Sequence, residues 1–419
     1  MTARNRELAN IAVVAVLTAI GFASGYIARE SVISAGSLFY AAIFAGLYLV
    51  AHAVARATVP HADPYLLPLA GLLSAVGVTE IYRLEPDDAF RQGLWVVVGV
   101  GVFAATLVLL RNRWRDLESY KYLFGLAAVA LLALPALPLI GERVNGARLW
   151  VDLGVLRFQP GELGKIALIV FLAGYLREKR EVLAQGRLKD FGPLLVIWGA
   201  AMLVIVVTND LGSALLYFGI FLAMLYVATA RVLFAAIGLA LFVGGSAAAY
   251  ALFPRVEERV RIWLDPFSDP HDTGYQLVQS LYSIANGGFA GTGLGRGTFT
   301  TTGGTELIPY LNTDFIYSAL AQELGLAGAA ALLLVYMVFA LRGFRIALLA
   351  HDGFSKLIAS GLTFAFVLQA FIIVGGMVRV IPLTGITLPF VSYGGSSIVA
   401  NFVLLAGLML VSDRANAPR

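Results

Sequence analysis

Long apolar runs alternate with short polar segments along almost the whole chain. Runs of about 17 to 25 apolar residues are long enough to cross the hydrocarbon core of a bilayer as helices. Such runs lie near 9–28, 36–57, 64–82, 93–110, 121–140, 160–177, 193–208, 210–229, 232–253, 314–341, 355–377 and 396–412. The pattern predicts an all-α, polytopic helical membrane protein with about 12 transmembrane helices. Only Thr208, Asn209 and Asp210 separate one pair, so the number of spans is open by about two.

The composition supports a membrane protein and excludes several kinds of functional site. Only 13% of the 419 residues are charged and 59% are hydrophobic, whereas about 25% are charged in a typical soluble protein. The chain has no cysteine, which excludes disulfides, thiolate metal sites and a cysteine nucleophile. Its four histidines are scattered without metal-ligand spacing, which argues against a zinc hydrolase. No cleavage site follows the first apolar run, so we interpret it as an uncleaved span.

Basic residues indicate how the chain crosses the membrane. If the N-terminus is cytoplasmic, three short inside segments are strongly basic. They hold Arg111, Arg113, Arg115 and Lys121, then Arg177, Lys179, Arg180, Arg187 and Lys189, then Arg342, Arg345 and Lys356. The large segment 254–313 holds only four arginines, so the positive-inside rule places it outside, together with 141–159 and 378–395. The net charge of +4 therefore reflects topology, and we expect no nucleic-acid partner.

The stretch 290–328 begins as a glycine-rich loop and ends as an apolar helix, with Asp314 where the two meet. Asn312 and Thr313 are good N-cap residues, which predicts Asp314 in the first helical turn. Unpaired backbone NH groups and the helix dipole favour an ionised carboxylate there. First-turn acids are also ordinary helix-start residues, so this alternative stays open.

The outer segment 254–313 has further structure in its pattern. Leu277, Leu281 and Ile284 recur at helical spacing before Gly287 and Gly288, which predicts a short helix with a glycine stop. This helix either lies on the membrane surface or packs into the core. The alternating glycines at 291–297 fit neither a Walker loop nor a dinucleotide fingerprint, and we interpret them as a loop whose NH groups could meet an anion.

Other polar clusters lie at the outer ends of spans. In the cluster 145–165, Glu162 and Lys165 are three residues apart on one face of a starting helix. They can pair with each other, as a plain helix-stabilising pair, or with a bound group. Asp210 lies between two apolar runs, where an acid needs a partner or water. The stretch 382–397 breaks an apolar background with prolines, glycines and hydroxyls, a backbone tolerated at this depth only in protein or beside a wet cavity.

These motifs, in this order over about residues 64–412, resemble the SEDS family of bacterial cell-wall proteins, which includes RodA and FtsW. The matching stretches are RLWVDLGVLRFQPGELGK, NDLG, DPFSDPHDTGYQLVQSLYSIANGGFAGTGLG, NTDFIYSALAQELGLAG and PLTGITLPFVSYGGSS. The resemblance implies a membrane-embedded peptidoglycan glycosyltransferase, with Asp314 in the place of the family's essential aspartate. It also implies the bacterial inner membrane, lipid II as substrate and a class B penicillin-binding protein as partner. Residues 63–419 would form the ten-span core, preceded by an additional helix pair in 1–62.

Several positions depart from the family's usual motifs. Residues 308–312 read Ile-Pro-Tyr-Leu-Asn, where the family often has Leu-Pro-Glu-x-His. Gly161 stands where the family commonly has a serine, and Thr208-Asn209 stands where it has Gln-Pro. The family usually has an arginine next to the tryptophan, whereas here Leu149 is next to Trp150 and Arg148 comes one residue earlier. Gly161 and the additional helix pair favour RodA over FtsW.

The implied chemistry assigns roles to the polar residues. A sugar hydroxyl attacks the anomeric carbon of a lipid-linked sugar and pyrophosphate leaves, so a base is needed at the hydroxyl and positive charge or NH groups at the pyrophosphate. Asp314 is the candidate base. The candidate substrate-binding residues are Arg148, Glu162, Lys165, Arg296, Glu306, Arg379, Ser396 and Ser397. Further polar or structural positions are Trp150, Gln159, Asp210, Gly394 and Gly395. Irregular helices near 145–165 and 380–397 would border the groove for the polyprenyl tails.

Other functions stay open at this point. A divalent cation, Mg²⁺ or Mn²⁺, is left open because the acids show no diagnostic ligand spacing. A lipid II flippase, a non-catalytic scaffold and an FtsW-like division enzyme are the alternatives. A transporter needs polar groups near the midplane that both sides can reach, whereas the polar elements here gather at one outer face.

Overall fold

The computed structural model describes residues 2–30, 35–138, 140–144, 147–154, 157–184, 191–300 and 306–418. Asn145 and Gly146, at the start of the predicted polar cluster, lie outside the described residues, as do Arg187 and Lys189 of one basic segment.

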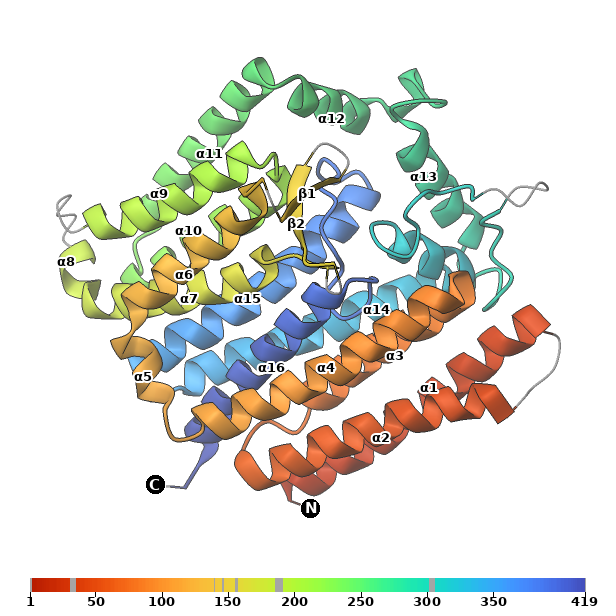
Figure 1. The fold of residues 1–419 in the computed structure, drawn as a ribbon, viewed down its shortest axis with the longest axis horizontal. Helices are drawn as coiled ribbons and strands as arrows, with labels where there is room; N and C mark the ends of the chain where they lie inside the picture. Colours follow the sequence, from red (N-terminus) through yellow and green to blue (C-terminus); the bar gives the residue numbers. More distant parts are fainter. Residues whose placement is uncertain are drawn as a thin grey trace.

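Every predicted span contains a helix (Figure 1). In chain order these are α1 (Ala3–Glu30), α2 (Ala35–Thr58), α3 (Leu66–Leu84), α4 (Pro86–Leu110), α6 (Lys121–Ala133), α7 (Gly161–Glu178), α9 (Gly192–Val207), α10 (Leu211–Thr229), α11 (Val232–Leu252), α14 (Ile316–Leu349), α15 (Gly353–Met377) and α16 (Gly395–Asn416). Within the described ranges, nine helices are long and apolar enough to cross a membrane. Of the other three, α6 and α9 are shorter, and α7 carries charged residues at both ends. The predicted polytopic helical membrane protein is confirmed.

The centre of the bundle is formed by α15 and α16. Most of the apolar stretch of each is buried, and they pack against α4, α7, α10 and α14. By contrast, no residue of α11 is buried. An apolar helix exposed all round is suited to contact with lipid, so α11 lies at the edge of the bundle.

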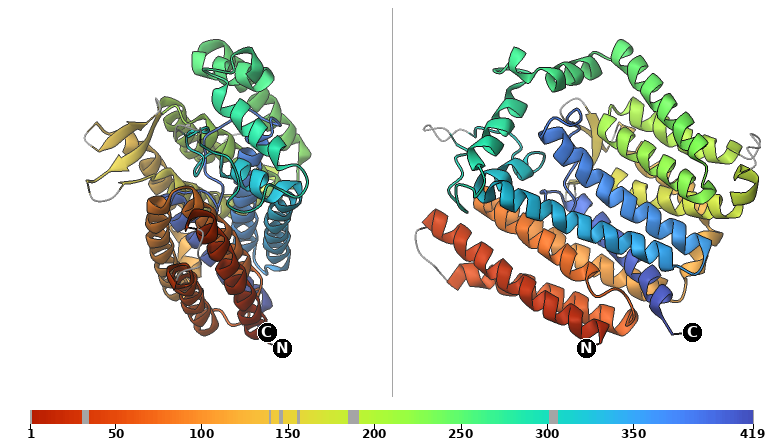
Figure 2. Two further views of the ribbon diagram at one scale, coloured as in Figure 1. Left: turned by 90° about the vertical axis from the view of Figure 1, so that its right-hand side faces the viewer. Right: turned by 180° about the vertical axis from the view of Figure 1, so that it is seen from behind.

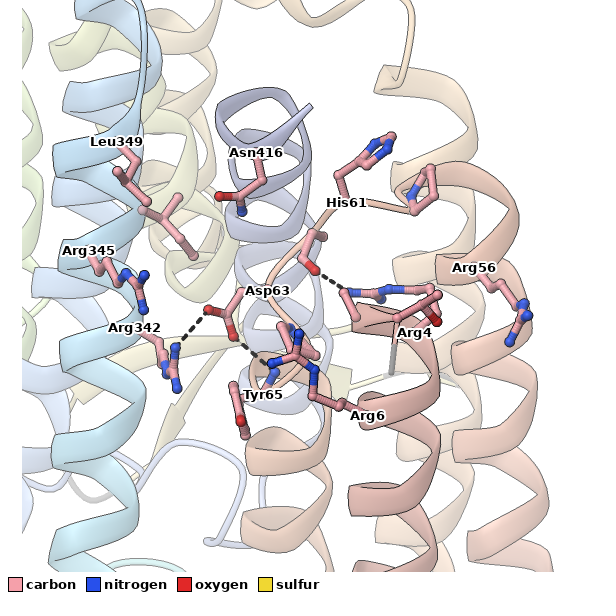
Figure 3. A pocket seen from close by; sticks show the side chains of 16 residues that line it. Arg4, Arg6, Arg56, His61, Asp63, Tyr65, Arg342, Arg345, Leu349 and Asn416 are labelled. Carbon is pink, nitrogen blue, oxygen red and sulfur yellow. Dashed lines mark hydrogen bonds and ion pairs between the residues drawn. The ribbon is translucent and has the colours of Figure 1, made fainter. Parts of the chain in front are cut away.

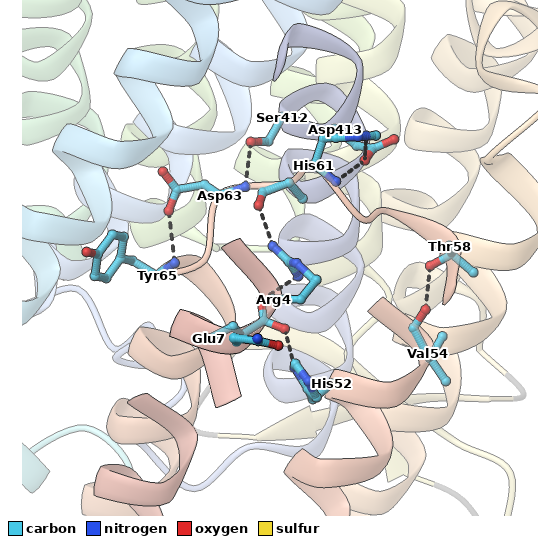
Figure 4. Close-up of polar contacts among 12 residues, drawn as sticks. Arg4, Glu7, His52, Val54, Thr58, His61, Asp63, Tyr65, Ser412 and Asp413 are labelled. Carbon is cyan, nitrogen blue, oxygen red and sulfur yellow. Dashed lines mark hydrogen bonds and ion pairs between the residues drawn. The ribbon is translucent and has the colours of Figure 1, made fainter. Parts of the chain in front are cut away.

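The N-terminal pair α1 and α2 runs along one side of the bundle, against α3 and α4 (Figures 1 and 2). Its linker to the core is held by hydrogen bonds, in which the backbone NH of His61 donates to Asp413 at 2.7 Å and that of Asp63 to Ser412 at 2.9 Å (Figure 4). The Arg4 guanidinium donates to the carbonyl of Ala62. Both chain termini lie at this end of the molecule. The short helices α5 (Trp114–Ser119) and α8 (Arg180–Ala184) join neighbouring spans.

The opposite end carries the elements of the large outer segments (Figure 1). After the 3-10 turn η1 (Leu134–Ala136), an antiparallel sheet is formed by β1 (Gly141–Val144), β2 (Ala147–Asp152) and β3 (Arg157–Phe158), in that order. Above it, α12 (Pro254–Leu264), the 3-10 turn η3 (Pro266–Ser268) and α13 (Tyr275–Gly287) form an arch from α11 to α14. The expected irregular helices at 145–165 and 380–397 are therefore wrong. Strands precede α7, and the described backbone from 378 to 394 is neither helix nor strand.

The short helix predicted around Leu277 is confirmed as α13. It ends at Gly287, and Gly288 follows with φ 53°, a conformation that favours glycine. Leu277 and Ser280 are buried, and the Ser280 hydroxyl lies 2.6 Å from that of Ser318 on α14. Packing into the core is therefore the alternative that the structure supports.

Candidate functional site

Asp314 lies in a turn ahead of α14, so the prediction of a first-turn position is wrong. The helix begins at Ile316, and the NH of Asp314 donates to the carbonyl of Tyr310 at 3.0 Å. The residues expected to cap the helix are held by tertiary contacts instead. The Asn312 carbonyl accepts from the NH of Tyr393 at 2.9 Å, and the Thr313 carbonyl accepts from the Ser392 hydroxyl at 2.5 Å. These contacts fix the turn against the residues that precede α16.

Burial, not a helix dipole, dominates the electrostatics of Asp314. Desolvation raises the pKa of its carboxyl from 3.8 to about 6, and the nearby Arg259 guanidinium acts in the opposite direction. A pKa about one unit below neutrality leaves the group mainly ionised at pH 7 and able to accept a proton.

Arg259 is a candidate site residue that sequence reasoning missed. It lies on α12, within electrostatic range of both Asp314 and Asp210, and its Nη1 lies 3.5 Å from the carbonyl of Thr384. Burial lowers its pKa from the ordinary value. One signal was present in the sequence, because Arg259 falls at helical spacing on the same face as Val256 and Trp263. A charge on the apolar face of an amphipathic helix needs a partner.

Arg379, a predicted pyrophosphate ligand, holds α12 in place. Its guanidinium donates to the carbonyls of Trp263, at 3.1 Å, and Leu264, at 2.6 Å, and the Trp263 indole donates back to the Arg379 carbonyl at 3.0 Å. These bonds satisfy the carbonyls at the end of α12. Its donors are thus used to fix the helix that carries Arg259.

Residues 378–394, which we term the outer connection, join the parts of the site. Gly385 has φ 73°, and a Cβ there would lie 3.7 Å from Oδ2 of Asp314, so the backbone passes directly beside the carboxylate. The Thr384 carbonyl faces Arg259, as described above. The same carbonyl would lie 2.8 Å from a Cβ at Gly212, which is two residues after Asp210. The Thr384 hydroxyl is buried and has no hydrogen-bond partner among the described residues. It is available to a bound group.

Glu162 and Lys165 pair with each other, as one of the two alternatives expected. The Lys165 Nζ lies 2.6 Å from Glu162 Oε2 and donates to Gln369 Oε1, also at 2.6 Å. Gln369 in turn donates to the Thr387 carbonyl at 2.9 Å. The lysine side chain is only 2% exposed. This buried pair links α7 and α15 to the outer connection.

The serines and glycines that precede and begin α16 make structural contacts. Ser396 accepts from the NH of Gln159 at 2.7 Å, and Ser397 accepts from the Thr387 hydroxyl at 2.8 Å. The NH of Gly394 donates to Gln92 at 3.1 Å. A Cβ at Gly395 would collide with the ring of Trp95. These contacts position the outer connection from the α4 and α7 sides.

The backbone NH groups of the glycine-rich loop bind an anion, as predicted, but this anion is the carboxylate of Glu323 in the same chain. The NH groups of Gly295 and Gly297 donate to the two carboxylate oxygens of Glu323, at 2.8 and 3.1 Å, and Arg83 lies 2.7 Å from the same carboxylate. Backbone groups that are already paired in this way are not free to bind a pyrophosphate.

The residues between α13 and this loop accept the hydrogen bonds that a break in α14 leaves unmade. Gly325 has φ 67° and interrupts the helix. The NH groups of Leu326 and Ala327, which lose their helical acceptors, donate instead to the carbonyls of Gly288 and Phe289 at 2.9 and 3.1 Å. The break thereby separates the short helix after Asp314 from the long apolar one, and its polar groups stay satisfied, as a membrane-spanning helix requires.

The remaining predicted residues are spread around the site. Arg148, on β2, and Arg296 are exposed, and no side-chain partner within the described residues is assigned to either. Glu306 is exposed and lines a cavity of about 270 Å³, which Arg83 and Asn312 also line.

Two further predicted residues make local contacts. The ring of Trp150 lies under the guanidinium of Arg157, whose Cζ is 5.0 Å from the ring centroid. Asp210 caps α10 by accepting from the NH of Ser213 at 3.0 Å.

No three His, Cys, Asp or Glu side chains in the described part of the chain lie close enough together to hold a metal ion. The residues present therefore do not form a protein cage for the divalent cation that the sequence left open. That cation stays a prediction, and removing metals with a chelator during the reaction tests it.

Comparisons with known proteins point to one family. Residues 64–417 match a family model for FtsW, RodA and SpoVE, described as cell cycle protein. The peptidoglycan glycosyltransferase RodA of Mycobacterium tuberculosis is 40% identical over 438 residues, covering 100% of this chain and 92% of that protein. The stage V sporulation protein E of Bacillus subtilis is 35% identical and covers 83% of this chain and 94% of that protein. The mycobacterial match includes the N-terminal helix pair, whereas the family model begins after it.

Solved structures agree with this result. A chain from a peptidoglycan synthase complex, described as coordinating polymerization and crosslinking, is 30% identical with a TM-score of 0.70, covering 84% of this chain and 98% of that one. The rod shape determining protein RodA of Thermus thermophilus is 25% identical with a TM-score of 0.62, covering 85% and 98%. The comparisons favour neither the flippase nor the scaffold alternative.

Proposed function

The chain belongs to the family that comprises FtsW, RodA and SpoVE, and from this premise we propose that it is a RodA-like peptidoglycan glycosyltransferase with Asp314 as its catalytic base. The observation that supports Asp314 as the catalytic base is the environment of its carboxylate. A partly desolvated carboxylate with a pKa of about 6 lies beside Gly385 and within the field of Arg259. A base with a pKa near the working pH is suited to proton transfer.

The proposed substrate is lipid II, and the step is a glycosyl transfer. Asp314 accepts the proton of the attacking sugar hydroxyl while its oxygen forms a bond to the anomeric carbon of the lipid-linked sugar. The bond from that carbon to the pyrophosphate oxygen breaks, and polyprenyl pyrophosphate leaves with the electron pair. Gly385 has no side chain, so no Cβ lies against Oδ2 of Asp314 where the acceptor sugar would approach.

Arg259 is placed to serve both partners in this step. Its charge favours the ionised form of Asp314, and it lies within electrostatic range of both Asp314 and Asp210. A pyrophosphate bound beside it would gain a charge-assisted contact, and the free Thr384 hydroxyl could donate a further hydrogen bond. Exposed Arg148 and Arg296 are left for the outer phosphate or the glycan.

The family and the charge pattern support a location and a partner for the chain. We place the multi-pass chain in the bacterial inner membrane with its N-terminus in the cytoplasm, so that Asp314 faces outward. We also propose a class B penicillin-binding protein as its transpeptidase partner. The relative from a complex that coordinates polymerization and crosslinking supports this choice.

The experiment is a reconstitution. The purified chain, alone and with its candidate transpeptidase, is given lipid II and the products are separated by gel electrophoresis. We expect glycan strands when both proteins are present, with release of polyprenyl pyrophosphate. Movement of lipid II between leaflets without polymer would show a flippase instead.

A further inference from the structure

A basic cavity of about 690 Å³ lies at the end of the molecule that carries both termini (Figure 3). It is formed by the start of α1, the linker to α3 and the ends of α14 and α16, so it lies between the N-terminal pair and the core. Its volume is within the range of small-molecule sites. Its arginines are Arg4, Arg6, Arg56, Arg342 and Arg345.

The positive charge of this cavity is only partly neutralised. Arg4 pairs with Glu7 at 2.6 Å, and Arg342 pairs with Asp63 at 3.3 Å. Arg56 donates to the neutral side chain of Asn5 at 3.2 Å. The other two arginines, Arg6 and Arg345, have no acidic partner within the described residues. At the rim, Asp413 is engaged by His61. The cavity therefore retains excess positive charge.

The unpaired guanidinium groups come from opposite walls. Figure 3 shows Arg6 reaching from α1 and Arg345 from α14 toward the same region around Asp63. Guanidinium groups match the geometry of phosphate oxygens and bind them through paired hydrogen bonds. A phosphate between them would also relieve the repulsion of like charges. We propose that this cavity binds the phosphate of an anionic phospholipid headgroup, held between Arg6 and Arg345.

The surface below the cavity favours a lipid over a soluble phosphate. Leu334, Val338 and Leu341 are exposed on α14 and lie on one helical stripe that ends at Arg345. Arginine at the end of an exposed apolar stripe allows a headgroup to bind while the acyl chains lie along the helix. Basic pockets between membrane helices are known to bind anionic headgroups in this way. A soluble phosphate would make no use of the stripe.

The bound lipid would join the N-terminal pair to the core. Arg6 belongs to α1 and Arg345 to α14, so one headgroup would contact both the N-terminal helix pair and the core. Because binding to the folded arrangement alone stabilises it, an anionic lipid should strengthen the docking of α1 and α2. This site lies at the C-terminal end of α14, whereas Asp314 precedes the start of that helix, and it does not depend on the proposed chemistry.

The test uses the full chain in nanodiscs that contain phosphatidylcholine with or without phosphatidylglycerol. Native mass spectrometry measures how much of each lipid remains bound after release from the disc. The pocket variant is Arg6→Gln with Arg345→Gln. The matched control is Arg113→Gln with Arg180→Gln, which removes the same charge from exposed positions of the described chain that do not line the cavity. A third variant, Arg6→Lys with Arg345→Lys, keeps the charge.

We expect the wild type and the control to retain phosphatidylglycerol preferentially. The pocket variant should retain about tenfold less, because two charge-assisted contacts are lost, and the lysine variant should recover part of the binding. Phosphatidylcholine should be unaffected, and inorganic phosphate should not displace the lipid. Equal loss in the pocket and control variants would contradict the site. Displacement of the lipid by inorganic phosphate would overturn the assignment to a lipid. A lysine variant that folds but binds no better than the glutamine variant would also contradict it.

Discussion

At the residue scale, the relation between Arg259 and Asp314 governs how activity depends on pH. The carboxylate must be deprotonated to act as a base, so activity should fall as the pH drops through about 6. Arg259 lowers the pKa of Asp314. In Arg259→Gln the acid limb of the pH–rate profile should therefore move to higher pH. Arg261→Gln on the same helix is the control. An acid limb at the same pH in all three proteins would show that Arg259 does not act on the base.

The buried Glu162 and Lys165 pair makes a separate residue-scale prediction. Glu162→Gln leaves the Lys165 charge buried without its carboxylate, which typically costs about 3–5 kcal/mol. The variant should therefore lose folded yield and activity together. Adding Lys165→Gln removes the uncompensated charge and should recover most of the unfolding temperature in detergent. A double variant that is no more stable than the single one would contradict a mainly structural role.

At the element scale, the break in α14 depends on Gly325. Its φ of 67° is unfavourable for other residues by roughly 1–2 kcal/mol, and a Cβ there would collide with the NH of Gly291. Gly325→Ala should lower the unfolding temperature and separate the glycine-rich loop from Glu323. Gly244→Ala is the matched control, because nothing lies within 4 Å of a Cβ at that position in α11. Equal stability of both variants would mean that the break is not a constraint on the fold.

Apolar runs were sufficient to predict the membrane-spanning helices, because the length of an apolar run is a local property of the sequence. The outer end was less predictable, because its structure depends on contacts distant in sequence. The start of α14 shifted to Ile316 because Ser392 and Tyr393 bind the expected capping residues. The glycine-rich loop takes its shape from Glu323, about 26 residues further along the chain. Glu162 and Lys165 were found by helical spacing alone, whereas Arg259 meets Asp314 only through the tertiary fold.

At the scale of the whole molecule, the charge pattern predicts which end faces the cytoplasm. The chain has no natural cysteine, so single cysteines can be labelled without background. Thr300→Cys should react with an impermeant thiol reagent applied to intact cells, because 254–313 is placed outside. Asn112→Cys, in an exposed turn between α4 and α5, should react only after the membrane is opened. The reverse labelling pattern would contradict the proposed orientation and with it the outward position of Asp314.

The most direct test of the central claim is the rate of glycan polymerisation from lipid II by purified Asp314→Asn with its transpeptidase partner. Asparagine has almost the same volume, and Asp314 does not cap α14, so the unfolding temperature and partner binding should change little. The amide cannot accept the hydroxyl proton, and the rate should fall by about two to four orders of magnitude. Asp87→Asn, an exposed acid in the first turn of α4, should retain the wild-type rate. A near-normal rate for Asp314→Asn would contradict the assignment of Asp314 as the catalytic base.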